Sequence, residues 1–238
     1  MMKIKYILFL FSFCFCLPAQ SEVSYSRELE EIFSKLDNMI LQREEYRLKK
    51  EERIEMLRNR IDMRASLEER FHTNKVLYEE YYVYNADSAM AYVSDNLRIA
   101  SLLKRKDWEY TWKINKSFLL SATGLLKEAE DELKDIPVQK LSDNAKVDYY
   151  SQMQYLLSHF SQYTGSESEA VQRSYLDKEL LYRDSVYMVA HPDHPLYLWY
   201  KGCKLQYDEV DSRQAVIQEK KKAIQSSSLE NRYDAMNA

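Results

Sequence analysis

The stretch "WKINKSFLLSATGLLKEAEDELKDIP" (Trp112 to Pro137) decides how the chain folds. Apolar residues recur at three- and four-residue spacing on both sides of Gly124, which predicts two helices joined by a short turn. In the second helix, the position expected to face the first carries the small Ala129 rather than a leucine. A small residue lets two antiparallel helices approach closely near their turn, so the stretch predicts a tight helical hairpin.

The same arrangement recurs along the chain. An alanine follows each suspected turn by four or five residues, and Gly124 and Gly165 mark two of those turns. Self-similar units at a near-constant spacing predict a solenoid of stacked hairpins. The alternative is an ordinary helical bundle in which the alanines coincide by chance. The alanines, expected to be repeat-packing residues, are separated by 40, 41 and 45 residues: Ala89, Ala129, Ala170 and Ala215.

Composition supports an all-α fold. The 238 residues include three Gly and four Pro, and sheets and loop-rich folds need more of these turn-forming residues. Aromatic residues make up 13% of the chain, which argues against disorder. The net charge of −4 gives no basic face for nucleic acid, so we expect no nucleic-acid binding by this chain.

The N-terminus predicts export. Residues 1–21 place Lys3 and Lys5 before an apolar run, and small residues follow it, which is the order of a secretory signal peptide. The apolar run of about twelve residues is shorter than the ~20 that span a bilayer. We expect cleavage after Ser21 and a periplasmic location, or one on the periplasmic face of the inner membrane. An uncleaved anchor, or lipidation at Cys14 or Cys16, is the alternative.

Two further regions follow. Residues 22–65 carry a narrow apolar seam among dense charge, which predicts one long helix or a helical pair capable of self-association. Residues 66–238 hold the hairpin repeats. The last stretch, "SSSLENRYDAMNA" (residues 226–238), starts like another helix and stops, so we expect the chain to be cut short. Membrane attachment would then lie only in a missing C-terminal segment.

Two resemblances rest on these residues. Ser117, Gly124 and Ala129 resemble the small residue, the glycine and the alanine of a tetratricopeptide repeat, although the spacing here is longer than the 34 residues of that family. The stretches at residues 36–61 and 77–100 resemble the N-terminal part of membrane-anchored regulators of Gram-negative bacteria. That resemblance implies an extracytoplasmic helical sensor whose transmembrane helix and helix-turn-helix domain are absent here.

Nothing in the sequence indicates catalysis, and we expect no catalytic residue, metal or cofactor. His191, Asp193 and His194 lie close together, but a structural zinc site needs four ligands, so an inter-helix loop is the simpler interpretation. Cys203 has no sequence partner that suggests a nucleophile, and a glycine-rich phosphate loop is missing.

Aromatic residues gather on the expected first helices of the hairpins, which line the concave face of a tetratricopeptide-type solenoid. An aromatic groove suits recognition of a peptide or protein; packing of the rings between layers is the alternative. We therefore predict a non-catalytic binding or sensor module of a transmembrane transcriptional regulator. The second hypothesis is a free periplasmic or envelope structural scaffold that assembles through the N-terminal helix. The residues expected to line the groove are Tyr81, Trp112, Tyr149 and Tyr200.

Overall fold

The computed structural model describes residues 27–59, 65–165 and 168–207, together with Lys222, and within these ranges it contains helices and no strand. The expected all-α, tetratricopeptide-like class is therefore confirmed. The chain divides into two compact units, Met1–Glu51 and Glu52–Ala238, and each is described by itself. The expected signal peptide, its cleavage site at Ser21 and the packing residue Ala215 lie outside the described residues.

The first unit contains helix α2 and the beginning of helix α3. Helix α2 spans Arg27–Leu41 and α3 spans Arg43–Asn59, so α3 begins in the first unit and ends in the second. Backbone hydrogen bonds continue across the junction, because Gln42 N donates to the Asn38 carbonyl and Tyr46 N donates to the Gln42 carbonyl, both at 3.1 Å. The two helices therefore follow each other with a single residue between them.

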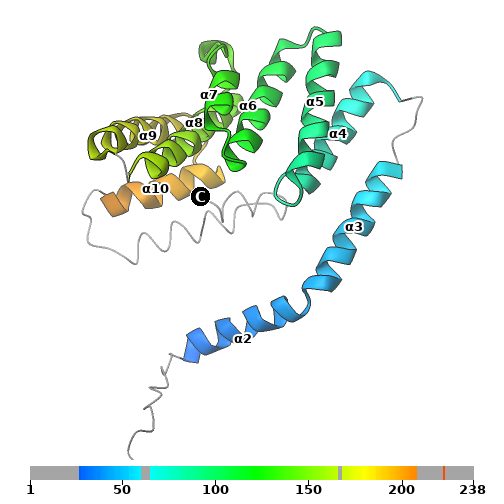
Figure 1. The fold of residues 1–238 in the computed structure, drawn as a ribbon, viewed down its shortest axis with the longest axis horizontal. Helices are drawn as coiled ribbons and strands as arrows, with labels where there is room; N and C mark the ends of the chain where they lie inside the picture. The colour runs from blue at the N-terminus through cyan, green and yellow to red at the C-terminus, as the bar shows by residue number, and fades with distance from the viewer. Residues whose placement is uncertain (1–26, 60–64, 166–167, 208–221, 223–238) are drawn as a thin grey trace, which may run out of the picture. The chain divides into compact units, whose positions relative to one another are not determined.

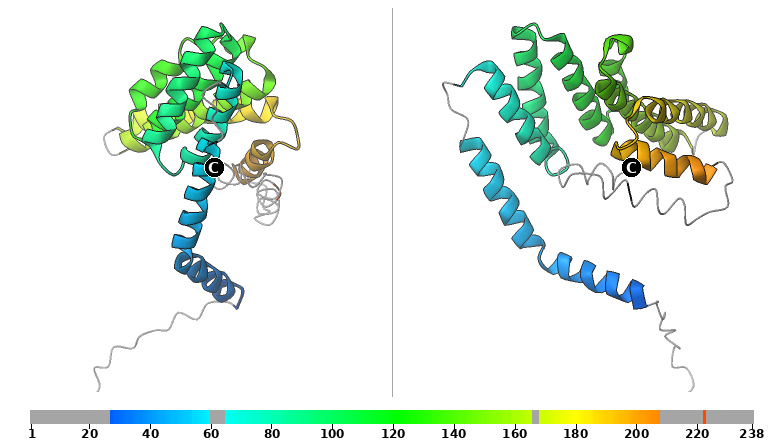
Figure 2. Two further views of the ribbon diagram at one scale, coloured as in Figure 1. Left: turned by 90° about the vertical axis from the view of Figure 1, so that its right-hand side faces the viewer. Right: turned by 180° about the vertical axis from the view of Figure 1, so that it is seen from behind.

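The second unit is a row of antiparallel hairpins. In Figure 1, α4 to α8 stand side by side in chain order, and α9 and α10 complete the row. Each helix contacts its successor, and α6 also contacts α8, so the first helices of neighbouring hairpins touch. Figure 2 shows α8 and α9 running alongside each other. The helices are α4 (Leu67–Tyr81), α5 (Ala86–Leu102), α6 (Lys106–Ala122), α7 (Leu126–Leu133), α8 (Asp143–Thr164), α9 (Glu169–Val189) and α10 (Pro195–Tyr207), with the short 3-10 helix η1 (Val138–Lys140).

Short polar residues cap the beginnings of α4, α5, α8 and α9. At α4, Ser66 and Glu69 form a capping box in which each side chain accepts a hydrogen bond from the other's backbone N–H. At α5, the Asn85 side chain accepts from Ser88 N at 2.9 Å. Caps of this kind satisfy backbone donors that a helix start leaves open. Ser66 and Asn85 therefore fix where α4 and α5 begin.

The apolar core is divided between consecutive hairpins. One cluster centres on Trp112 and joins α4, α5 and α6, together with Ile54 from the end of α3. A second cluster joins α6, α7 and α8 around Leu133 and Leu156. A third joins α8, α9 and α10 around Val186. Each hairpin thus buries its apolar face against the next one, as expected of a solenoid.

Buried polar side chains link the helices as well. Gln152 of α8 donates from Nε2 to the hydroxyls of Ser117 and Ser121 of α6, at 3.0 Å each. Between α4 and α5, the Asn74 amide donates to Asn96 Oδ1 at 2.9 Å. All five side chains are buried. Because buried polar groups must be hydrogen-bonded, these contacts restrict how the helices can be placed on one another.

Candidate functional site

The four residues expected to line a groove are all buried. Trp112 is 1% exposed, and the exposed fractions of Tyr81, Tyr149 and Tyr200 are at most 8%. Trp112 packs edge-on against Phe71 of α4. None of the four presents a side chain to a ligand, so the groove assignment is wrong for these positions. The reason is helical geometry: neighbouring residues on a helix point about 100° apart, so the rotation of each helix decides which ring of an aromatic group faces inward, and these four are the rings that face a neighbouring helix.

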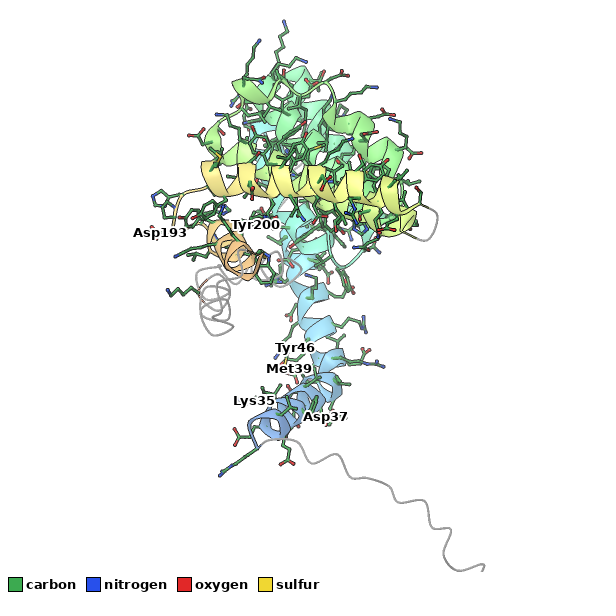
Figure 3. All side chains as sticks on the ribbon, turned by 90° about the vertical axis from the view of Figure 1, so that its left-hand side faces the viewer. Lys35, Asp37, Met39, Tyr46, Asp193 and Tyr200 are labelled. Carbon is green, nitrogen blue, oxygen red and sulfur yellow. The ribbon has the colours of Figure 1, made fainter. Side chains whose placement is uncertain are left out.

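Tyr200 illustrates the packing role. In Figure 3 its label lies where α10 meets α9, and its hydroxyl donates to Gln154 Oε1 of α8 at 3.0 Å. The Gln154 amide nitrogen donates in turn to Glu179 of α9 at 2.7 Å. Burial raises the pKa of Tyr200 far above its usual range, and burial also raises the pKa of Glu179. These hydrogen bonds link α8, α9 and α10.

Accessible rings occur beside the buried ones and form a continuous row. Tyr82 at the end of α4, Phe118 of α6, and Tyr155 and His159 of α8 are each partly exposed. Consecutive ring centroids lie 5.9, 5.4 and 4.5 Å apart, which is within the range of favourable aromatic contacts. We call these four residues the aromatic ladder. It crosses three successive first helices of the hairpins.

The ladder is attached to the core at one end. Tyr82 stacks on the buried Tyr78 at 5.7 Å, and Tyr78 packs edge-on against Trp112 at 5.2 Å. Rings held in this way lose little additional freedom when something binds to them, and preorganisation of this kind favours binding.

The ladder is electrically neutral at neutral pH. Partial burial lowers the pKa of His159 below the usual 6.5 and raises the pKa of Tyr155 above the usual 10.0. Both shifts favour the uncharged form of the ring. The ladder therefore offers apolar ring faces with polar edges, which suits an apolar or aromatic side chain of a partner.

The expected repeat-packing residues fall into two groups. Ala89 and Ala129 are 0% exposed, which is compatible with close helix contact at both positions. Ala170 is exposed as the second residue of α9. It therefore does not lie between two helices, and the contact between α8 and α9 does not depend on its small side chain. The packing assignment is wrong for Ala170.

The two glycines expected to be repeat-packing residues, Gly124 and Gly165, have different surroundings. Gly124 has φ +84° in the turn between α6 and α7, a backbone conformation that a residue with a Cβ adopts only with strain. Gly165 follows α8 with helical φ and ψ. A Cβ there would lie 2.4 Å from Gln172 Nε2, which is the far end of a flexible side chain that can move aside, so neither backbone conformation nor space requires glycine at this position.

The histidine cluster is a loop in the structure. His191 Nδ1 accepts a hydrogen bond from Asp193 N at 3.3 Å, and His194 Nδ1 accepts from Leu196 N at 3.2 Å. Asp193 lies in the turn between α9 and α10 (Figure 3). In the described part of the chain, no three His, Cys, Asp or Glu side chains are grouped as metal ligands would be. Within that same part, every helix is too short or too polar to cross a membrane.

The ladder residues are related in sequence to the buried core residues. Three of the four accessible rings sit one residue from a buried position: Tyr82 follows Tyr81, Phe118 follows Ser117, and Tyr155 precedes Leu156. The sequence shows that aromatic residues are grouped on these helices. Which ring of a group is exposed depends on how the helix is rotated about its axis, and the sequence alone does not give that rotation.

Comparison with known proteins gives one family. A sequence model described as the SusR N-terminal TPR domain matches residues 40–238 of this chain. No curated protein and no solved structure gives a significant match.

Proposed function

Because this chain belongs to the family of SusR N-terminal TPR domains, we propose that it is the sensor part of a transmembrane transcriptional regulator. TPR domains bind proteins and are typically non-catalytic, so its activity is recognition of a partner. We assign no reaction, metal or cofactor to it. The signal would be the presence or absence of a bound peptide or protein segment.

The observation that carries this proposal is the aromatic ladder. Tyr82, Phe118 and Tyr155 come from three successive first helices, and first helices line the concave face of a tetratricopeptide-type solenoid. Partly exposed aromatic rings are frequent among the residues that dominate binding energy at interfaces. The ladder therefore supports binding of a segment that runs across the hairpins and places apolar side chains on the rings.

We further propose the division of the chain that this role requires. Residues 1–21 would direct export, residues 22–65 would form a helical lead-in, and residues 66–238 would form the repeats. The domain would act in the periplasm or on the periplasmic face of the inner membrane. The apolar run that follows Lys3 and Lys5 supports this placement.

A random-peptide display library panned on the full chain tests the proposal, with enriched peptides resynthesised and measured by calorimetry. We expect F118A and Y155A to weaken binding about tenfold or more, because each removes a central ring. Y163A is the matched control, since Tyr163 lies on α8 and is 65% exposed but stands outside the ladder. Circular dichroism establishes that each variant is folded.

Two results would overturn the proposal. One is the absence of any enriched peptide. The other is a set of peptides whose affinity changes equally in Y163A and in the two ladder variants, which would place the binding surface elsewhere.

A further inference from the structure

Helix α2 carries an apolar face that is exposed within its own unit. Leu29, Ile32, Leu36, Met39 and Ile40 are 36–58% exposed. Their three- and four-residue spacing places them on one side of the helix. Large apolar side chains in one continuous stripe differ from the scattered exposed ones of an ordinary surface. The stripe therefore indicates an interaction surface.

The charges of α2 argue against a lipid surface as the partner. Helices that lie on membranes are rich in Lys and Arg around the apolar face. Helix α2 has four acidic residues and two basic ones, a net charge of −2. The surface therefore suits a protein helix.

The residues next to the stripe favour a second copy of the same helix. Lys35 and Asp37 precede and follow Leu36, so each lies about 100° away from it, on opposite sides of the stripe. Figure 3 shows their labels on the two sides of α2. Neither side chain has an ion-pair partner among the residues that the structure describes.

Orientation follows from these two charges. In a parallel pair of identical helices, the two opposite flanks meet, so Lys35 of one copy approaches Asp37 of the other, twice by symmetry. In an antiparallel pair, like flanks meet, which would place Lys35 near Lys35 and Asp37 near Asp37. Opposite charges beside an apolar seam select partner and orientation in coiled coils, so the parallel arrangement is favoured.

The end of the stripe limits the paired segment. The positions that continue it into α3 are Arg43, Arg47 and Lys50. In a parallel pair these positive charges would face their own copies and repel. The single-residue junction at Gln42 lies where that change begins.

We propose that the chain forms a parallel two-fold dimer through α2, with the apolar stripe at the seam and Lys35 of each copy paired with Asp37 of the second copy. The dimer does not depend on peptide binding by the ladder, so either proposal can fail while the other stands. With four turns of helix in contact, the dimer dissociates on dilution.

Sedimentation velocity on the full chain, over a range of concentrations, measures the dimer. We expect a concentration-dependent dimer in the wild type and at least a tenfold weaker one in L36E. The matched control is L181E, because Leu181 is a 68% exposed leucine on α9; it should leave the dimer unchanged. A wild type that is monomeric at every concentration, or equal losses in L36E and L181E, would overturn the proposal.

Charge reversal then tests the orientation. K35D should weaken the parallel dimer about two- to tenfold at low salt, because each of two exposed attractions becomes a repulsion. The double variant K35D/D37K should restore it. An antiparallel dimer would be indifferent to K35D, since like charges meet before and after the change. An unchanged affinity in K35D, or no recovery in the double variant, therefore refutes the parallel arrangement.

Discussion

Ala89 offers a sensitive test of how the hairpins are packed. Its side chain is 0% exposed, whereas Ala91 in the same helix α5 is exposed. A89L would add three carbon atoms where the helices leave no space. Overpacking of this kind costs typically 1–3 kcal/mol, while an exposed substitution stays within about 0.5 kcal/mol. Helix propensity does not separate the two variants, since Ala and Leu are both good helix formers.

The measurement is urea unfolding of both variants, followed by far-UV circular dichroism, with thermal unfolding as a second readout. For a chain of this size, the expected loss in A89L corresponds to a Tm lower by roughly 2–12 °C, while A91L should unfold like the wild type. A129L should behave like A89L, because Ala129 is also 0% exposed. A170L should behave like A91L. Equal effects of A89L and A91L would show that close helix contact at Ala89 is not what the packing requires.

Three further predictions concern the turn, the buried amide and the ladder. G124A should cost about 1–2 kcal/mol from backbone strain alone, because φ is +84° and the added Cβ would meet only Tyr163 Oη at 3.6 Å; G124N should cost less in the same unfolding assay. Q152L should cost about 1–3 kcal/mol by leaving the Ser117 and Ser121 hydroxyls without their donor, and a loss no greater than that of an exposed glutamine such as Gln139 would contradict this. The lowered pKa of His159 means that the folded state disfavours its protonation, so its contribution to stability is complete above pH 6.5 and is lost as pH falls below that value; the urea midpoint of wild type should therefore drop more between pH 7.5 and 5 than that of H159Q.

The fold was predictable because its determinants are local. The low Gly and Pro content, the three- and four-residue apolar spacing and Gly124 between two helices all act within a few residues of the chain. Those local features suffice to predict helices and hairpins.

The accessible surface was harder to predict because it depends on the rotation of each helix. Tyr81 and Tyr82 are adjacent in sequence, yet the first is buried and the second is partly exposed. Ala170 follows its turn at the same interval as Ala129, but α9 begins at Glu169 and places Ala170 in its first turn. Helix α7 begins two residues after Gly124 and α9 begins four residues after Gly165, and this two-residue difference changes which side chain meets the neighbouring helix.

The buried amide pair between α4 and α5 has a consequence for misfolding. An interface of apolar side chains alone tolerates a slip of one helical turn, since one leucine can replace another. Asn74 and Asn96 meet at 2.9 Å, and the Asn96 amide also donates to the Phe71 carbonyl at 3.0 Å. After a slip these groups would lie buried without partners, at a cost of about 1–3 kcal/mol each. The two asparagines therefore fix the register of α4 against α5. Replacing both by leucine would leave a hairpin that is apolar enough to form, but its two helices could pair in a shifted register.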